Sequence, residues 1–156
     1  MTEDPSSHAR LRLYPALPLL AVSVCVFRGE SALLATRVRP PYEGAFSLPG
    51  GLVEAGETLA EAAVRELDEE VGVSARILGF NRHVESVERD EAGRVRRHFV
   101  IASFVAEWIS GEGTPGPEAG EVVWAAPASL DALTLTPMTA EVVRAAAALL
   151  PALRKA

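Results

Sequence analysis

Residues 51–73 read GLVEAGETLAEAAVRELDEEVGV, and the interpretation of the whole chain begins from this stretch. It holds three glutamates close together, Glu66, Glu69 and Glu70. On a helix that turns by about 100° per residue they lie at roughly 0°, 300° and 40°, within one narrow arc. Like charges on one arc repel one another, and the negative end of the helix dipole adds to that repulsion. We therefore expect the arc to hold a hard divalent cation such as Mg²⁺.

The same stretch carries the signals of a helix. Thr58 followed by Glu61 is typical of a capping box, so the helix is expected to begin near Leu59. Gly72 is a good C-terminal stop. Four apolar residues recur at roughly 100° to 160° on the same wheel and are expected to form the core stripe: Ala60, Val64, Leu67 and Val71.

Other charged residues of the stretch are expected to lie outside the metal site. Asp68 falls near 200°, roughly opposite the carboxylate arc. Glu61 and Arg65 are one helical turn apart and are expected to pair on the outer surface. The competing interpretation of the whole stretch is an amphipathic helix whose acidic face is solvated and binds nothing.

The spacing of fixed residues resembles the Nudix box, the signature of the Nudix hydrolases. The matching positions are Gly51, Glu57, Arg65-Glu66-Leu67, Glu69-Glu70 and Gly72-Val73. The resemblance implies an α+β fold, an α/β/α sandwich in which a mixed β-sheet lies between helices and the box forms a loop–helix–loop. It also implies hydrolysis of a nucleoside diphosphate linked to another group, with Mg²⁺ as cofactor or Mn²⁺ as its substitute.

The resemblance also implies roles for individual residues of the box. Glu66, Glu69 and Glu70 would be the metal ligands, joined by the backbone carbonyl of Gly50. Glu57 and Arg65 would brace the loop and orient the carboxylates. A pyrophosphate is itself anionic, so an acidic protein site needs bridging cations to bind it and to stabilise the transition state.

Two acidic residues outside the box are further candidates. Glu118 and Glu121 precede Trp124 by six and three residues, and in some Nudix pyrophosphatases a metal-binding glutamate precedes a tryptophan in this way. We expect Glu118 to reach the metals or to act as the base, with Glu121 as its competitor. The alternative for each is a solvated acid, and the identity of the base stays open.

Basic residues outside the box are candidates for phosphate binding. Arg37 and Arg39 follow an expected strand, and a guanidinium there could hold a phosphate bidentately. Arg97 belongs to a basic cluster, 94–98, at an expected hairpin. Exposed strand-end or hairpin charge is the competing interpretation for all three arginines.

Composition excludes several functional classes. The 156-residue chain has a net charge of −6, so there is no basic surface for nucleic acid. Cys25 is the only cysteine; it lies in an apolar run and is expected to be a buried thiol in a reducing cytoplasm. Residues 17–27 are apolar but too few to span a membrane. We expect a flexible tail over residues 1–12 and a single domain over residues 13–156.

Apolar runs and turn signals predict the remaining elements. Strands are expected over 19–27, 32–38 and 121–125, and a long hairpin over 76–108. A short helix or turn is expected over 127–133. Thr136 followed by Pro137 predicts the start of a final helix that runs to about Leu150.

Three functions remain in competition. The leading one is hydrolysis of ADP-ribose or a nucleotide sugar, and the second is a house-cleaning pyrophosphatase for oxidised nucleoside triphosphates. The third, of another class, is a non-catalytic nucleotide-sensing module. The sequence is compatible with a homodimer but does not reveal the oligomeric state.

Overall fold

A computed structural model describes residues 12–156, so the predicted tail lies outside the described residues except for Arg12. The elements in chain order are β1 (Leu19–Arg28), β2 (Ser31–Arg37), β3 (Phe46–Ser47), β4 (Gly50–Leu52), α2 (Leu59–Val71), β5 (Ser74–Arg89), β6 (Val95–Ser110), β7 (Ala119–Ala125), the 3₁₀ helix η1 (Pro127–Ala132) and α3 (Thr139–Lys155).

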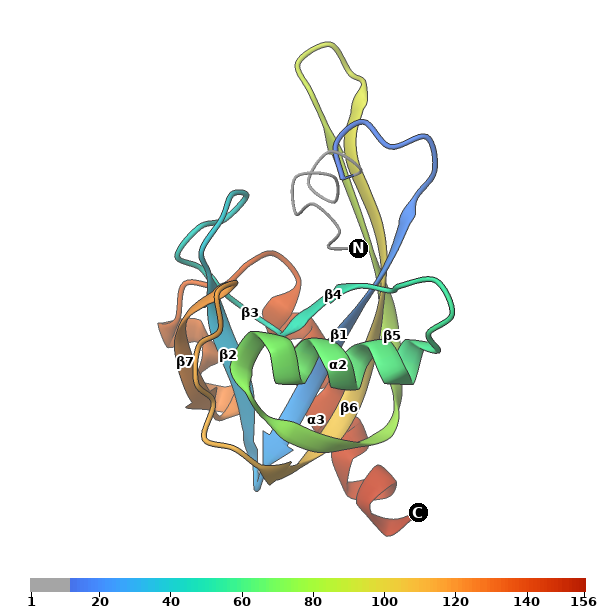
Figure 1. Ribbon diagram of the computed structural model, residues 1–156. Helices are drawn as coiled ribbons and strands as arrows, with labels where there is room; N and C mark the ends of the chain where they lie inside the picture. The colour runs from blue at the N-terminus through green and yellow to red at the C-terminus, as the bar shows by residue number, and fades with distance from the viewer. Residues whose placement is uncertain (1–11) are drawn as a thin grey trace.

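Seven strands form one mixed sheet with the order β3-β2-β1-β6-β5, while β4 pairs with β1 and β7 pairs with β2. The central pair β1 and β6 is parallel, from Leu19 opposite Phe99 to Phe27 opposite Glu107. The other pairs of strands are antiparallel. Figure 1 shows α2 on one face of the sheet and α3 on the other. The predicted α/β/α sandwich with a mixed sheet is therefore confirmed.

Each helix has its own core on its side of the sheet. On the α2 side, Leu67 and Val71 pack with Val24 and Val26 of β1. On the α3 side, Val143, Ala146 and Leu150 pack with alternate residues of the same strand, among them Phe27. Because side chains of a strand alternate between the two faces, β1 contributes to both cores and is buried on both sides.

The capping of α2 is as predicted. The Thr58 hydroxyl accepts a hydrogen bond from the Glu61 N–H, and the Glu61 carboxylate accepts one from the Thr58 N–H at 2.7 Å. Gly72 ends the helix in the left-handed conformation, at φ 62°. Local sequence therefore determines both ends of α2.

The predicted core stripe of α2 is wrong in two positions. Val64 is 43% exposed and Ala60 is only partly buried, whereas Ala62 and Ala63 are fully buried beside Leu67 and Val71. The buried arc thus runs from roughly 320° to 140° on the wheel used above and includes the positions of Glu66 and Glu70. The helix is rotated so that these two carboxylates lie at the packed face of α2 and not on its outer surface.

The predicted start and end of the last helix are also wrong. α3 begins at Thr139, because Thr136 is engaged elsewhere. The Thr136 N–H donates to the Phe46 carbonyl of β3 at 2.9 Å, and the hydroxyl groups of Thr136 and Thr139 share a hydrogen bond of 2.7 Å. Met138 precedes α3 in the left-handed conformation, at φ 69°. The helix continues through Pro151 to Lys155, and Leu153 of this last part packs against the hydrophobic core on the α3 side of the sheet.

β5 and β6 form the predicted hairpin, and it projects beyond the rest of the sheet (Figure 1). Its pairing shifts register at several points, the first of them between Ser74 and Ala75. Cys25 is fully buried and forms no disulfide, as predicted, and burial raises the pKa of its thiol. Among residues 12–156, no helix is long and apolar enough to cross a membrane.

Replacement of Thr58 by alanine should lower the free energy of unfolding by about 1 kcal/mol, because the capping hydroxyl of α2 is lost. Urea denaturation would measure this difference. Thr58→Ser keeps the hydroxyl and is the matched control. Equal stability of the alanine and serine variants would contradict the importance of this cap.

Candidate active site

The glutamates of α2 lie directly against the short glycine strand β4. The Gly50 N–H donates a hydrogen bond of 2.9 Å to Oε2 of Glu70. A Cβ on Gly51 would lie 2.4 Å from the Glu66 carboxylate, and one on Gly50 would lie 2.1 Å from the Val22 carbonyl oxygen. At Gly50 the obstacle is backbone of β1, so only glycine permits this approach, whereas at Gly51 a Cβ would displace the end of the Glu66 side chain from its position against β4.

Arg65 connects the loop before α2 to the glutamates of the helix. Its guanidinium pairs with both carboxylate oxygens of Glu57 and donates to the Leu52 carbonyl at 3.1 Å. Its Nη1 donates to Oε1 of Glu66 at 2.9 Å and to Oε2 of Glu69 at 3.2 Å. One planar cation thus joins the loop and two carboxylates of the arc.

These contacts differ from the pairing that the sequence suggested. The Glu61 carboxylate caps the helix at Thr58, so the predicted Glu61–Arg65 pair is wrong. The hydrogen bond from Arg65 lowers the pKa of Glu57 to about 2, with help from the Glu54 N–H. The same bond to Glu57 raises the pKa of Arg65. Arg65 therefore acts as a permanent counter-ion within this loop.

Two carboxylates of the arc are disfavoured as anions. Burial is the largest cause that raises the pKa of Glu70 to about 7; the Gly50 N–H opposes it, and the charges of Glu66 and Glu118 add to it. Burial also raises the pKa of Glu66; Arg65 opposes this effect and the charge of Glu69 adds to it. Buried negative charges that repel one another are stabilised by a nearby cation.

The chemistry of these residues fits a hard divalent cation. Carboxylate and carbonyl oxygens are the donors that Mg²⁺ prefers, and here they carry more negative charge than Arg65 neutralises. In the part of the chain that the structure describes, no three His, Cys, Asp or Glu side chains converge as a metal-binding group. Glu66 and Glu69 point instead to Arg65, and Glu70 to Gly50. Each of these contacts uses one carboxylate oxygen, Oε1 of Glu66 and Oε2 of Glu69 and of Glu70, so the second oxygen of each is not engaged by them.

Glu118 lies in the loop before β7 and belongs to the same electrostatic environment. Its Oε1 is 3.1 Å from Nη2 of Arg39, and both side chains are largely exposed. Its charge contributes to raising the pKa of Glu70, as noted above. Glu121, the competing candidate, is an exposed residue of β7 whose N–H donates to the Thr36 hydroxyl at 2.7 Å.

Arg37 ends β2 at the edge of the sheet where β1 begins. Its Nε donates to the Pro41 carbonyl at 2.7 Å, and no carboxylate of residues 12–156 pairs with it within 4.0 Å. Burial is the main cause that lowers its pKa; the charge of Glu70 opposes this effect, whereas Arg12 and Arg97 add to it. A half-buried guanidinium that has no carboxylate partner among residues 12–156 and lies near two other arginines is suited to bind an anion.

Arg97 and Arg12 are the other two arginines at this edge. Arg97 pairs with Glu88 across the hairpin. Arg12 was not predicted, because it lies in the supposed tail, yet its charge lowers the pKa of both Arg37 and Glu66. Its segment is attached to the hairpin by Tyr14, which donates from its N–H to Arg96 at 2.8 Å and from its hydroxyl to Asp90 at 3.0 Å. No local sequence pattern predicts these contacts between Tyr14 and the hairpin.

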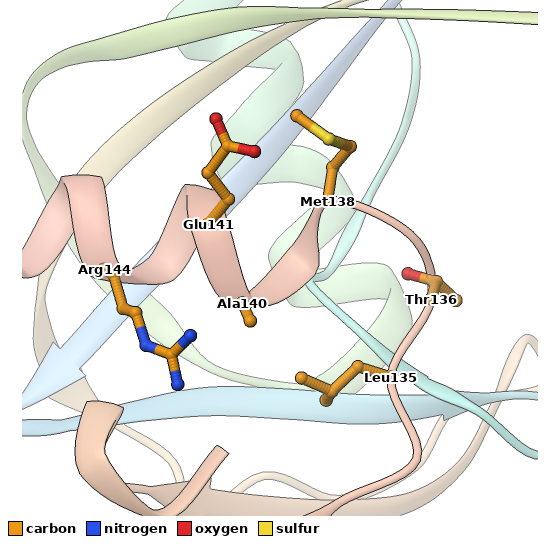
Figure 2. A pocket seen from close by; sticks show the side chains of 6 residues that line it. All are labelled: Leu135, Thr136, Met138, Ala140, Glu141 and Arg144. Atoms are coloured by element: carbon orange, nitrogen blue, oxygen red, sulfur yellow. The ribbon is translucent and has the colours of Figure 1, made fainter. Parts of the chain in front are cut away.

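A pocket of about 430 Å³ lies elsewhere, at the start of α3. Figure 2 shows that Glu141 and Met138 point to one side of the helix, while Arg144 and Leu135 lie on the other. The residues that line this pocket include none of α2 or of the loop before it. It is therefore distinct from the carboxylate arc.

The sequence profile of the NUDIX domain matches residues 17–146, which include the glycine strand, the whole of α2 and the loop that holds Glu118. The chain belongs to this family. The NUDIX match accounts for the acidic helix, the bracing Arg65 and the mixed sheet together. The part of the chain that it leaves out at the N-terminal side includes Arg12.

Relatives of this chain in the NUDIX family carry the names of different activities. The chain is 38% identical over 112 residues to an ADP-ribose pyrophosphatase of Methanocaldococcus jannaschii, which covers 72% of this chain and 62% of the relative. It is 44% identical over 66 residues to a putative 8-oxo-dGTP diphosphatase of Mycobacterium tuberculosis, covering 42% of this chain and 47% of the relative. The chain therefore spans less than two thirds of the length of either protein.

A solved NUDIX structure shares the fold. The MutT NUDIX hydrolase from Burkholderia pseudomallei superposes with a TM-score of 0.72 at 26% identity, covering 82% of this chain and 97% of that protein.

The pKa of Glu70 predicts how the stability of this NUDIX protein depends on pH. A folded-state pKa raised from 4.5 to about 7 means that the folded chain retains a proton which the unfolded chain has lost. The free energy of unfolding therefore falls as pH rises between these two values. In the presence of a chelator, Glu70→Gln should remove this part of the fall and be more stable than the wild type at pH 8 by on the order of 2 kcal/mol.

Urea titrations at pH 5 and at pH 8 would measure both free energies. Glu69→Gln removes a carboxylate from the exposed side of the same helix and is the control for the change in net charge. If the Glu70→Gln variant and the wild type differed equally at the two pH values, the buried anion would not be the cause.

Proposed function

We propose that this protein hydrolyses the phosphoanhydride bond of a nucleoside diphosphate linked to a second group, most specifically ADP-ribose or a nucleotide sugar. The observation that carries this proposal is the combination of a partly buried carboxylate arc on α2 with a half-buried Arg37 near enough for its charge and that of Glu70 to interact. Anionic oxygens suit divalent cations, and a guanidinium suits the phosphate oxygens of the same ligand.

Glu66, Glu69 and Glu70 would hold the metal, with the Gly50 carbonyl beside them. When bound, Mg²⁺ neutralises the pyrophosphate and lowers the pKa of the attacking water. Arg65 ties the loop before α2 to the helix through its bonds to Glu57 and Glu66. These bonds fix the backbone that carries the carboxylates. The proposed ligands thus lie on one helix whose backbone the fold holds in place.

The residues outside the box bind substrate or assist the reaction in this proposal. Arg37 binds a phosphate, and Arg97 and Arg12 contribute positive charge at the same edge. Arg39 holds Glu118, which is available as a further ligand or as the proton acceptor. Exposed Arg39 contributes less to phosphate affinity than Arg37, since solvent screens it and Glu118 already neutralises it.

The choice of substrate rests on similarity to named relatives. The longer match, over 112 residues, is to an ADP-ribose pyrophosphatase. The shorter match, over 66 residues, supports the alternative, an oxidised nucleoside triphosphate such as 8-oxo-dGTP. A non-catalytic sensor of nucleotides would bind one of these molecules without turnover.

A substrate panel with Mg²⁺ tests the proposal. ADP-ribose should yield AMP faster than 8-oxo-dGTP yields its monophosphate, and a chelator should abolish both reactions. Glu70→Gln should lower kcat on the order of a hundredfold while the protein stays folded, since metal-supplied stabilisation amounts to several kcal/mol. Binding without turnover in the wild type would support the sensor instead, and a preference for 8-oxo-dGTP would support the alternative substrate.

Arg37→Gln should raise the KM for ADP-ribose by about tenfold, because a charge-assisted hydrogen bond to phosphate contributes roughly 1.5–3 kcal/mol. Steady-state kinetics would measure the change. Arg76→Gln removes an equal charge from an exposed position of β5 and is the control. Equal KM values for the two variants would exclude Arg37 from the phosphate site.

A further inference from the structure

The loop between β6 and β7, residues 111–118, lies against the C-terminal end of α2. Figure 1 shows it, in orange, passing that end of the helix. The N–H groups of Thr114 and Gly116 donate to the carbonyls of Val71 and Glu70, each at 2.8 Å. These are among the last carbonyls of the helix, which have no partner within the helix itself. The loop therefore caps the helix at the residue that carries the most buried carboxylate of the arc.

The approach is too close for side chains. A Cβ on Gly116 would lie 2.5 Å from the Glu69 carbonyl oxygen, and one on Gly111 would lie 2.4 Å from that of Gly72. Gly111 also has a φ of 93°, a conformation that other residues rarely adopt. Gly116 thus packs directly on the helix backbone, and Gly111 packs on the residue that ends the helix.

A cluster of aromatic and charged side chains holds the first part of the loop. The Arg28 guanidinium lies 4.2 Å from the ring centroid of Trp124 and 5.5 Å from that of Trp108, and it pairs with the Glu112 carboxylate at 3.0 Å. The two indole N–H groups bind the loop backbone: Trp108 donates to Gly111 at 2.7 Å and Trp124 to Glu112 at 3.0 Å. Arg28 thus joins both tryptophans to the loop that they hold.

We propose that Arg28 is a positioning residue for the active site: by holding residues 111–112 between Trp108 and Trp124, it fixes the loop that caps Glu70 and carries Glu118. The loop reads GEGTPGPE and, apart from a turn at 117–118, has no regular structure before β7. Such a segment has high conformational entropy unless it is anchored. Arg28 does not touch the substrate, and its role in catalysis rests on the function proposed above.

The test compares Arg28→Gln with Arg154→Gln. Arg154 is a matched control, because its side chain is exposed to the same extent, 34%, and it pairs with Glu107 and with the Gly29 carbonyl without touching the loop. In metal-free protein, amide hydrogen exchange at Thr114 and Gly116 should be faster by at least about tenfold in Arg28→Gln and unchanged in Arg154→Gln. Arg28→Lys keeps the charge but loses the planar group, and should lie between the two.

Steady-state kinetics test whether the anchored loop contributes to kcat. With Mg²⁺ and ADP-ribose, Arg28→Gln should lower kcat on the order of tenfold and change KM by less than about twofold. Combined with Glu118→Gln in a double-mutant cycle, its effect should be less than additive, because both changes remove the same positioned carboxylate. A role in overall stability alone would give additive effects.

The outcomes separate this inference from the proposed function. Unchanged exchange at both amides in Arg28→Gln would overturn the anchoring of the loop. Faster exchange with unchanged kcat, or with additive effects in the cycle, would overturn the role in positioning. If the wild type hydrolysed nothing in the panel, the proposed function would fail and the positioning role with it, whereas the exchange arm would still test the anchoring.

Discussion

The close approach of α2 to the glycine strand β4 is the constraint on which the rest of the site depends. It places Glu66 and Glu70 where burial and repulsion between carboxylates disfavour their charge, and it brings the Glu66 carboxylate to the place that a Cβ on Gly51 would take. Arg65 compensates part of this cost through its bonds to Glu57 and the arc. Buried carboxylates that repel one another cost the fold stability, and in the function proposed above a bound cation would offset that cost.

Sheet topology brings distant parts of the chain to the same edge. β1 runs parallel to β6 and antiparallel to β2, so the start of β1, the end of β2 and the first part of β6 lie together. Arg97 is near enough for its charge to act on Arg37 for this reason, and so is Arg12, whose segment Tyr14 ties to the hairpin. At the other end of β1, Arg28 and the two tryptophans hold the loop that returns to α2.

Local structure was predictable where neighbours in sequence determine it. The ends of α2 follow from the capping box at Thr58 and from Gly72. The predictions that failed were those that depended on distant partners. The rotation of α2 was misjudged because the apolar stripe with Ala60 and Val64 competes with a second one through Ala62 and Ala63, and the sheet selects the second. α3 starts late because Thr136 bonds to β3.

The sequence by itself determined the acidic helix, its caps and the pattern that belongs to the NUDIX family, because these depend on residues within a few turns of one another. Only the tertiary structure decided which carboxylates are buried, that Arg65 pairs with Glu57 and not with Glu61, and that Arg12 lies near enough for its charge to act on Glu66. Burial and long-range charge depend on what packs across the sheet, and no spacing along the chain encodes those distances.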